Sequence, residues 1–434
     1  MSFLTKPINE ISALSNKEHK IEKIKEAILD ANSKELQIEK LFELIEVYEA
    51  NKKFLYAQYY TEELLKKDQK NLKARIKLAR YYLINSHATK SINLVKLLKK
   101  EEPNNIDVLS LFGEQSRLLG NYKDIEKTFK KILEINPTKE DTVIAYSNIC
   151  GALVVQKKFK EALKYGIKGY KINTQSIPLL MNLINSLLYN DKFEEAFKRT
   201  RDLEKIEPLN PIVGSVGLYL AEQLGLSHKF KIYSDPFDYI KEYTINFSNQ
   251  DKKDSKDELI NVINKIPREW EPADKSTESG FQTESLLFSK YRNEYPLERL
   301  SNIIISKIQE YKNSLTDSEN LFVSAFPKNI SINGWAVILK KSGKQRSHNH
   351  PAGWISGVLY LKVPKKLVGD EGKIEFSTYG YNYPKITEKI RKKAYSPKEG
   401  QLILFPSLLY HGTLPFQSDE DRISIAFDVH PMDD

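Results

Sequence analysis

The stretch "GKQRSHNHPAGWISGVLYLKVP", Gly343 to Pro364, places two histidines one residue apart, just before an apolar run typical of a buried strand. Successive side chains of a strand point to opposite faces, so residues i and i+2 share a face. If the strand begins near His348 and His350, their imidazoles lie on the same face and can converge on one ion. The spacing therefore predicts two candidate metal ligands at the mouth of a β structure.

Further along the chain, a third histidine and an arginine follow two more strand-like runs. His411 comes just after "QLILF" and an "FPS" turn, and "RISIAFDV" begins with Arg422 and places Ser424 on the same face. A neutral imidazole suits iron, copper or zinc, whereas an inward arginine suits a carboxylate held by two hydrogen bonds. The region thus combines candidate metal ligands with a candidate anion-binding residue.

The region around these residues has the pattern of an antiparallel β domain. Short β-type runs separated by Gly, Pro and Lys dominate from about residue 320, and they predict a sandwich or barrel. The runs are "LFVSAF", "NGWAVILKK", "WISGVLYLKV", "GKIEFS", "QLILF" and "RISIAFDV". Helices are expected before them at about 256–264 and 296–313, with "REWEPADKSTESGFQTESLLF" as an ordered loop between.

In order and spacing, this region resembles the Fe(II)/2-oxoglutarate-dependent oxygenases, in a group related to prolyl 4-hydroxylase. The elements that carry the resemblance are Gly343, His348-Asn349-His350, Tyr360-Leu361, Pro397-Lys398-Glu399-Gly400, Phe405-Pro406, His411 and Arg422-Ile423-Ser424. The resemblance implies a double-stranded β-helix of the jelly-roll or cupin-like type, with Fe(II) and 2-oxoglutarate as cofactors. It also implies iron ligands at His348 and His411, and a cosubstrate carboxylate bound by Arg422 with help from Ser424. The implied activity is hydroxylation, with no catalytic residue beyond the metal site.

One position departs from the family pattern, because His350 stands where a carboxylate ligand is usual. Three interpretations follow. His350 is the third ligand of a three-histidine site, which we prefer, or it lines the pocket and water completes a two-histidine site. In the third interpretation a remote acid, Glu375 or Asp428, binds the metal.

Some aromatic residues near these motifs are candidates for lining a substrate pocket, although a large aromatic in a strand is more often part of the core. They are Trp335, Trp354 and Tyr360. The insert "STYGYNYPKITEKIRKKAYS" between two strands is basic and rich in tyrosine. It is interpreted either as a lid that faces the substrate or as a solvated loop.

The first half of the chain is helical in period and repeats itself. A landmark residue recurs at steps of 34, 34, 37 and 34 residues, at Phe54, Ala88, Tyr122, Phe159 and Phe193. Small residues nine positions earlier (Ala79, Gly113, Cys150) and alanines three positions later (Ala57, Ala162, Ala196) repeat with it. This helix–turn–helix period resembles the tetratricopeptide repeat. The three extra residues of the fourth unit are expected in the loop between its two helices.

The resemblance covers about residues 38–208, with flanking helices expected at 18–31 and 211–225. We therefore predict a helical solenoid over residues 1–225 and an oxygenase domain over 226–434. The repeats are expected either to bind a protein or peptide partner, or to serve as a spacer or dimerisation element. Two rival functions stay open. One is a three-histidine iron dioxygenase that uses no 2-oxoglutarate, and the other is a non-catalytic scaffold.

Composition narrows the class of protein. Of 434 residues, 40% are hydrophobic and 11% aromatic, which is enough for folded cores. No apolar run is long enough for a membrane span, and the single cysteine, Cys150, fits a reducing cytoplasm. The net charge of +9 comes from lysines spread among 58 acidic residues, which is typical of solvated helix faces. We accordingly expect a cytoplasmic protein that binds neither membranes nor nucleic acid.

Overall fold

The computed structural model describes residues 8–226, 230–232, 235–247, 255–273, 275–316 and 318–432, with backbone only for 8–18. Contacts between Cα atoms divide the chain into two compact units, Met1–Asn173 and Thr174–Asp434. The boundary that we predicted from the sequence, between a solenoid ending at residue 225 and a second domain starting at residue 226, remains a prediction. Within the described residues, no helix is both long enough and apolar enough to span a membrane.

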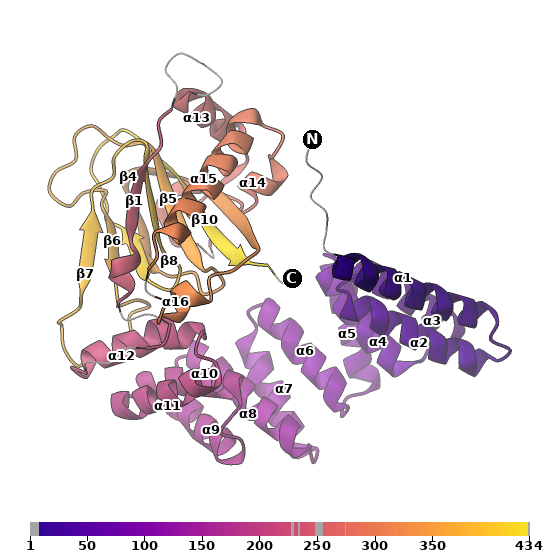
Figure 1. Ribbon diagram of the computed structural model, residues 1–434. Coiled ribbons are helices and arrows are strands. Elements are labelled where there is room, and N and C mark those ends of the chain that lie inside the picture. The colour runs from indigo at the N-terminus through magenta and orange to yellow at the C-terminus, as the bar shows by residue number, and fades with distance from the viewer. Residues whose placement is uncertain are drawn as a thin grey trace. The chain divides into compact units, whose positions relative to one another are not determined.

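The first unit consists of helices joined by short turns (Figure 1). Their bounds are α1 Ile8–Leu29, α2 Lys34–Ala50, α3 Phe54–Lys67, α4 Leu72–Ile84, α5 Ala88–Glu101, α6 Ile106–Leu118, α7 Tyr122–Glu134, α8 Lys139–Val155 and α9 Phe159–Ile172. Four of the repeat landmarks are the first residues of α3, α5, α7 and α9. The predicted solenoid of paired helices is confirmed, including a flanking helix at its start.

Close packing inside each helix pair explains the small residues of the repeat. A Cβ atom built at Gly113 of α6 would lie 2.4 Å from the Phe129 ring of α7, so only glycine fits there. Ala79 and Cys150 are completely buried at the equivalent positions of their repeats. The predicted place of the three extra residues is wrong. They lengthen α8 to 17 residues, compared with 13 in α4 and α6, and the turn to α9 keeps its usual length.

The second unit begins with helices and continues into the β domain. Its helices are α10 Ile177–Leu188, α11 Phe193–Ile206, the π-helical turn η1 Val213–Gly217, α12 Leu218–Gln223, the 3₁₀ turn η2 Pro236–Tyr239, α13 Lys256–Lys265, α14 Leu287–Lys290, α15 Tyr295–Asn313 and α16 Leu321–Ser324. Phe193 begins α11, so α10 and α11 are the fifth helix pair. The expected helices near 211–225, 256–264 and 296–313 are all present.

The β domain is a curled antiparallel sheet of ten strands among the described residues. The strands are β1 Lys241–Thr244, β2 Arg268–Trp270, β3 Thr277–Thr283, β4 Ile330–His348, β5 Ile355–Lys362, β6 Ile374–Ser377, β7 Lys392–Tyr395, β8 Gln401–Pro406, β9 Tyr410–Thr413 and β10 Arg422–Pro431. Their order is β1-β8-β5-β10-β4-β9-β6-β7, with β3 also paired to β4, and β2 to β3. This arrangement is jelly-roll-like and confirms the predicted fold class.

Two local predictions for this domain are wrong. The run "LFVSAF" forms the short helix α16 instead of a strand, and the expected loop before α14 contains β2 and β3. The segment of β3 forms a strand because β4 is unusually long and pairs with it over Val337–Gln345. Sequence patterns of period two are weak in such a polar segment, so pairing decides its structure.

The long strand β4 positions the site. Its first half pairs with β10, and its last residues pair with β9. Strands β5, β8 and β10 are buried almost throughout, because one face lines the interior of the curled sheet and the other is covered. Figure 1 shows α13, α14 and α15 grouped at one side of the strands and β6 and β7 at the other.

Candidate metal centre

Three histidines meet at one end of the curled sheet. His348 is the last residue of β4 and lies directly opposite His411 of β9, while His350 follows in the turn after β4. One ring nitrogen from each lies within 4.8 Å of the others, and the ring centroids are 4.5 to 5.1 Å apart. Imidazoles gathered in this way can bind one divalent metal ion.

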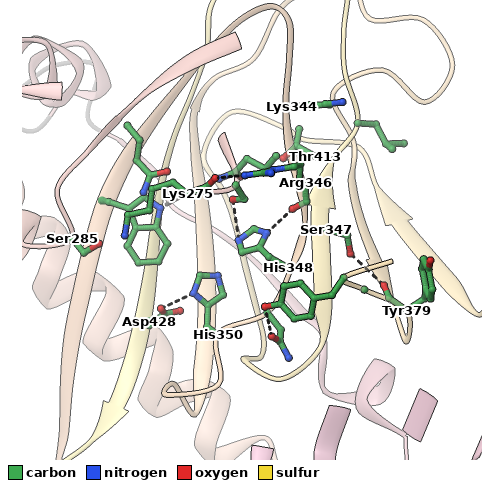
Figure 2. Close-up of a pocket in the computed structure, with 18 of the residues that line it drawn as sticks. Lys275, Ser285, Lys344, Arg346, Ser347, His348, His350, Tyr379, Thr413 and Asp428 are labelled. Atoms are coloured by element: carbon green, nitrogen blue, oxygen red, sulfur yellow. Dashed lines mark hydrogen bonds and ion pairs between the residues drawn. The ribbon is translucent and has the colours of Figure 1, made fainter. Parts of the chain in front are cut away.

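Hydrogen bonds define which nitrogen of each imidazole is available. The Nδ1 atoms of His348 and His411 lie 2.7 Å and 3.0 Å from the carbonyl oxygens of Arg346 and Leu409. Nδ1 of His350 lies 2.9 Å from Oδ2 of Asp428 (Figure 2). Carbonyl and carboxylate oxygens only accept, so we assign the proton of each neutral ring to Nδ1. Each ring then carries its lone pair on Nε2, as a metal ligand requires, and on His348 the Ser276 hydroxyl lies 3.3 Å from that atom.

Burial keeps the rings of His348 and His411 in the form that binds metal. Burial, together with the neighbouring His350, lowers the pKa of His348 to about 4. Burial also lowers the pKa of His411 well below its usual value. A charged imidazole has no lone pair for a metal, so neutral rings at pH 7 fit a metal centre.

A narrow inner cavity of about 20 Å³ leads from the histidines to Arg422. Arg422 is only 1% exposed, and its Nε and Nη1 atoms have no hydrogen-bond partner. The Oη atom of Tyr360 is buried without a partner too, and the guanidinium carbon lies 4.8 Å from the centre of that ring. Burial lowers the pKa of Arg422 and raises the pKa of Tyr360 to about 12. A buried guanidinium is costly unless an anion pairs with it, so the residues present fit a bound carboxylate.

An outer cleft of about 960 Å³ opens on the other side of the histidines. His348 and His350 line both spaces, whereas His411 and Arg422 line only the inner cavity. Other residues shared by the two spaces are Trp335, Gln345, Thr413 and Asp428. The candidate metal centre therefore lies where a small inner chamber and a large outer chamber meet.

The other sequence-predicted residues lie at different distances from this centre. Trp335 lines both chambers and stacks on His350 at 5.5 Å, and Tyr360 lines the inner one. Ser424 is buried beside Tyr360 in the sheet but is not among the residues that line either chamber. Trp354 faces a separate cavity and stacks on Phe322 at 5.8 Å.

The two remote acids considered from the sequence both have protein partners. Glu375 forms an ion pair of 2.8 Å with Lys392. Asp428 accepts hydrogen bonds from Ser356 and His350 through its two oxygens. Sequence reasoning did not find this link to His350. Asp428 comes six residues after Arg422, so the alternation of β10 could have placed it on the same face, but not beside His350.

The insert between β6 and β7 contributes one wall of the outer cleft. Its residues Tyr379, Tyr381 and Asn382 line the cleft, and the Tyr381 hydroxyl donates to Oδ1 of Asn349 at 2.9 Å. The rest of the insert is tied to α12 by three residues of that helix. The Tyr219 hydroxyl donates to the carbonyl of Pro384 at 2.6 Å. Glu222 and Gln223 accept from backbone N–H groups of Arg391, Ile386 and Thr387 at 2.6 to 3.0 Å. The insert thus faces the cleft and is held on its far side.

Comparison with known proteins bears on this region. Residues 333–428 match the family model described as "Putative 2OG-Fe(II) oxygenase". The match to this oxygenase family runs from β4 into β10 and contains all three histidines, Arg422 and Asp428. No curated protein matches the chain.

Solved structures similar to the chain include repeat proteins. A tetratricopeptide repeat protein from Parabacteroides merdae has 16% identity and a TM-score of 0.40, with 50% of this chain and 84% of that chain covered. Pseudomonas aeruginosa pilF has 15% identity and a TM-score of 0.40, covering 44% and 86%. A MamA mutant has 14% identity and a TM-score of 0.33, covering 40% and 100%.

Proposed function

We propose that the C-terminal domain is an Fe(II)- and 2-oxoglutarate-dependent oxygenase that hydroxylates its substrate. The observation that carries the proposal is the unpaired, buried guanidinium of Arg422 in the same inner cavity as the three histidines. A metal site alone leaves that cation unexplained. An anionic cosubstrate that also contacts the metal accounts for both features. The oxygenase family match over the same residues supports this function.

Each chamber then has a distinct task. His348, His350 and His411 would hold Fe(II), and Arg422 would hold the distal carboxylate of 2-oxoglutarate through two hydrogen bonds. Iron and 2-oxoglutarate together would supply the activation of dioxygen for hydroxylation of a C–H bond. Tyr360 offers its hydroxyl beside the same carboxylate. The narrow inner chamber keeps water away from this charge pair and so strengthens it.

The outer chamber is where the substrate would bind. It is wide, and its rim includes the cations Lys275, Lys344 and Arg346 and the tyrosine wall of the insert. Such an open cleft suits a side chain presented by a protein or peptide, and repeat solenoids commonly bind proteins. We propose a polypeptide substrate recruited by the repeats, in a cytoplasmic protein whose single cysteine, Cys150, is buried.

The test combines metal analysis with turnover of 2-oxoglutarate. Purified protein should bind one Fe(II) per chain and form succinate from 2-oxoglutarate only when iron and oxygen are present. His411→Ala should abolish both. Metal bound without any 2-oxoglutarate binding would instead favour a three-histidine dioxygenase that uses another cosubstrate. Absence of metal binding would favour a non-catalytic scaffold.

A further inference from the structure

The carboxylate of Asp428 lies against the Nδ1 side of the His350 ring. Its Oδ2 atom is 2.9 Å from Nδ1 of His350, and both side chains are largely buried (Figure 2). Asp428 is on β10, opposite Ser356 of β5. The contact therefore joins the turn after β4 to a central strand of the sheet.

Asp428 is itself held in place. The Ser356 hydroxyl donates to its Oδ1 at 2.6 Å and lies 2.9 Å from the hydroxyl of Ser407. The backbone carbonyl of Ser407 accepts from the N–H of His350 at 2.8 Å. A Cβ atom at Gly353 would lie 2.6 Å from the Ser407 hydroxyl, so glycine lets the turn approach this closely. The carboxylate and the backbone of His350 are thus fixed by the same small network.

Two neighbouring rings lie nearly parallel to the His350 ring and restrain its plane. Trp335 stacks at 5.5 Å with an interplanar angle of 27°, and His411 stacks at 5.1 Å with an angle of 17°. Stacking restrains the plane of the ring. It still allows a half-turn about the Cβ–Cγ bond, which returns the ring to the same plane with its nitrogens on the opposite side. The hydrogen bond to Asp428 removes that freedom because only Nδ1–H can donate to the carboxylate from this side.

We propose that Asp428 is a positioning residue that makes His350 a metal ligand. It fixes the ring orientation and the proton on Nδ1, which leaves Nε2 with the lone pair that a metal requires. The inference rests on the proposed metal centre and goes beyond it. A carboxylate behind a ligating histidine also makes the imidazole a stronger donor. An aspartate ligand would bring its negative charge directly to the ion. In this chain the carboxylate of Asp428 is instead hydrogen-bonded to His350.

The experiment is a double-mutant cycle read out by metal affinity. Co(II) and Zn(II) are titrated into metal-free wild type, Asp428→Ala, His350→Ala and the double variant, without cosubstrate and without any assay of turnover. Asp428→Ala should weaken binding by about 10- to 100-fold. In the His350→Ala background the same change should have almost no further effect, because Asp428 acts through that ring. Asp428→Asn, whose amide oxygen still accepts from Nδ1–H, should fall between wild type and alanine.

Control variants separate this inference from the metal centre itself. Glu375→Ala removes an acid on strand β6, next to β9, that is paired with Lys392, and it should leave metal affinity unchanged. His411→Ala should lose the metal. If wild type binds no metal, or His411→Ala binds as wild type does, the metal centre is wrong. If His411→Ala weakens binding while Asp428→Ala and Asp428→Asn do not, only the role of Asp428 is wrong.

An additive cycle would also overturn the proposal. Equal losses from Asp428→Ala with and without His350 would mean that Asp428 affects the metal independently of His350, for example as a direct ligand. Thermal unfolding of the metal-free variants distinguishes general damage from a positioning role. Asp428→Asn keeps the shape of the side chain, so it provides the affinity comparison if the alanine variant does not fold.

Discussion

Replacing Arg422 by methionine should change cosubstrate affinity and protein stability in opposite directions. The guanidinium is 1% exposed, and two of its nitrogens have no partner. Methionine has a similar length and removes the charge without leaving a large void. In the complex, the variant leaves a buried carboxylate without its counterion, which typically costs about 3–5 kcal/mol. At about 1.4 kcal/mol per factor of ten, affinity for 2-oxoglutarate should fall by roughly 150- to 4,000-fold.

The ligand-free protein should respond the other way. Burial of an unpaired cation costs free energy, and an apolar residue of similar volume avoids that cost. Replacing buried charges in this manner has stabilised other proteins by about 1–4 kcal/mol. At about 2–4 °C per kcal/mol for a domain of this size, Arg422→Met should raise the melting temperature by several degrees. An arginine kept only for structure would show a decrease instead.

Two measurements on the same samples decide the matter. Calorimetric titration of 2-oxoglutarate into Mn(II)-loaded protein under argon gives the affinity, and thermal unfolding of ligand-free protein gives the stability. Arg268→Met is the matched control, because Arg268 is exposed on β2, where its guanidinium contacts Asn264 and the Phe281 ring. Unchanged affinity in Arg422→Met, together with a lower melting temperature, would refute the assignment of Arg422 to the cosubstrate.

The remaining predictions concern the repeats and the insert. Burial alone would raise the pKa of Glu126, but hydrogen bonds from Lys130 and other partners outweigh it and hold the pKa at about 2. As pH falls, the Glu126 carboxylate therefore takes up a proton in the unfolded state before it does so in the folded state. The stabilisation is complete above about pH 4.5 and disappears towards pH 2, and acid denaturation of Glu126→Gln should show a weaker dependence over that range. Gly113→Ala forces a methyl group against Phe129 and should lower the free energy of unfolding in urea by about 1–3 kcal/mol. Gly120→Ala is the control: its Cβ would meet no atom within 4 Å, so it tests the strain of a positive φ alone. Gln223→Ala removes the acceptor for two N–H groups of the insert, so trypsin should cut the insert several-fold faster while metal affinity stays the same. Equal cutting rates would show that α12 does not hold the insert.

The repeat architecture follows from the sequence because its signal is local. Each unit buries the same face against its neighbours, so small residues such as Ala57 and Gly113 must recur at one spacing. The spacing of the histidine pair is also local, but the expectation that both stand on one strand is wrong, because His348 ends β4 and His350 lies in the turn after it. The order of His411 and Arg422 after strand-like runs was enough to group them with that pair. These features need only period and order.

Other features depend on which strands become neighbours, and the tertiary structure alone decided them. Asp428 reaches His350 from β10 because the register of the sheet places it there, and no local pattern contains that register. The polar segment of β3 became a strand because β4 offered it an edge. Trp354 and Trp335 look alike in sequence, yet closure of the sheet directs Trp335 to the histidines and Trp354 to another cavity. The local sequence determines the type of a side chain and the face of the helix or strand on which it lies. The packing of segments far apart in the chain determines which partner it meets.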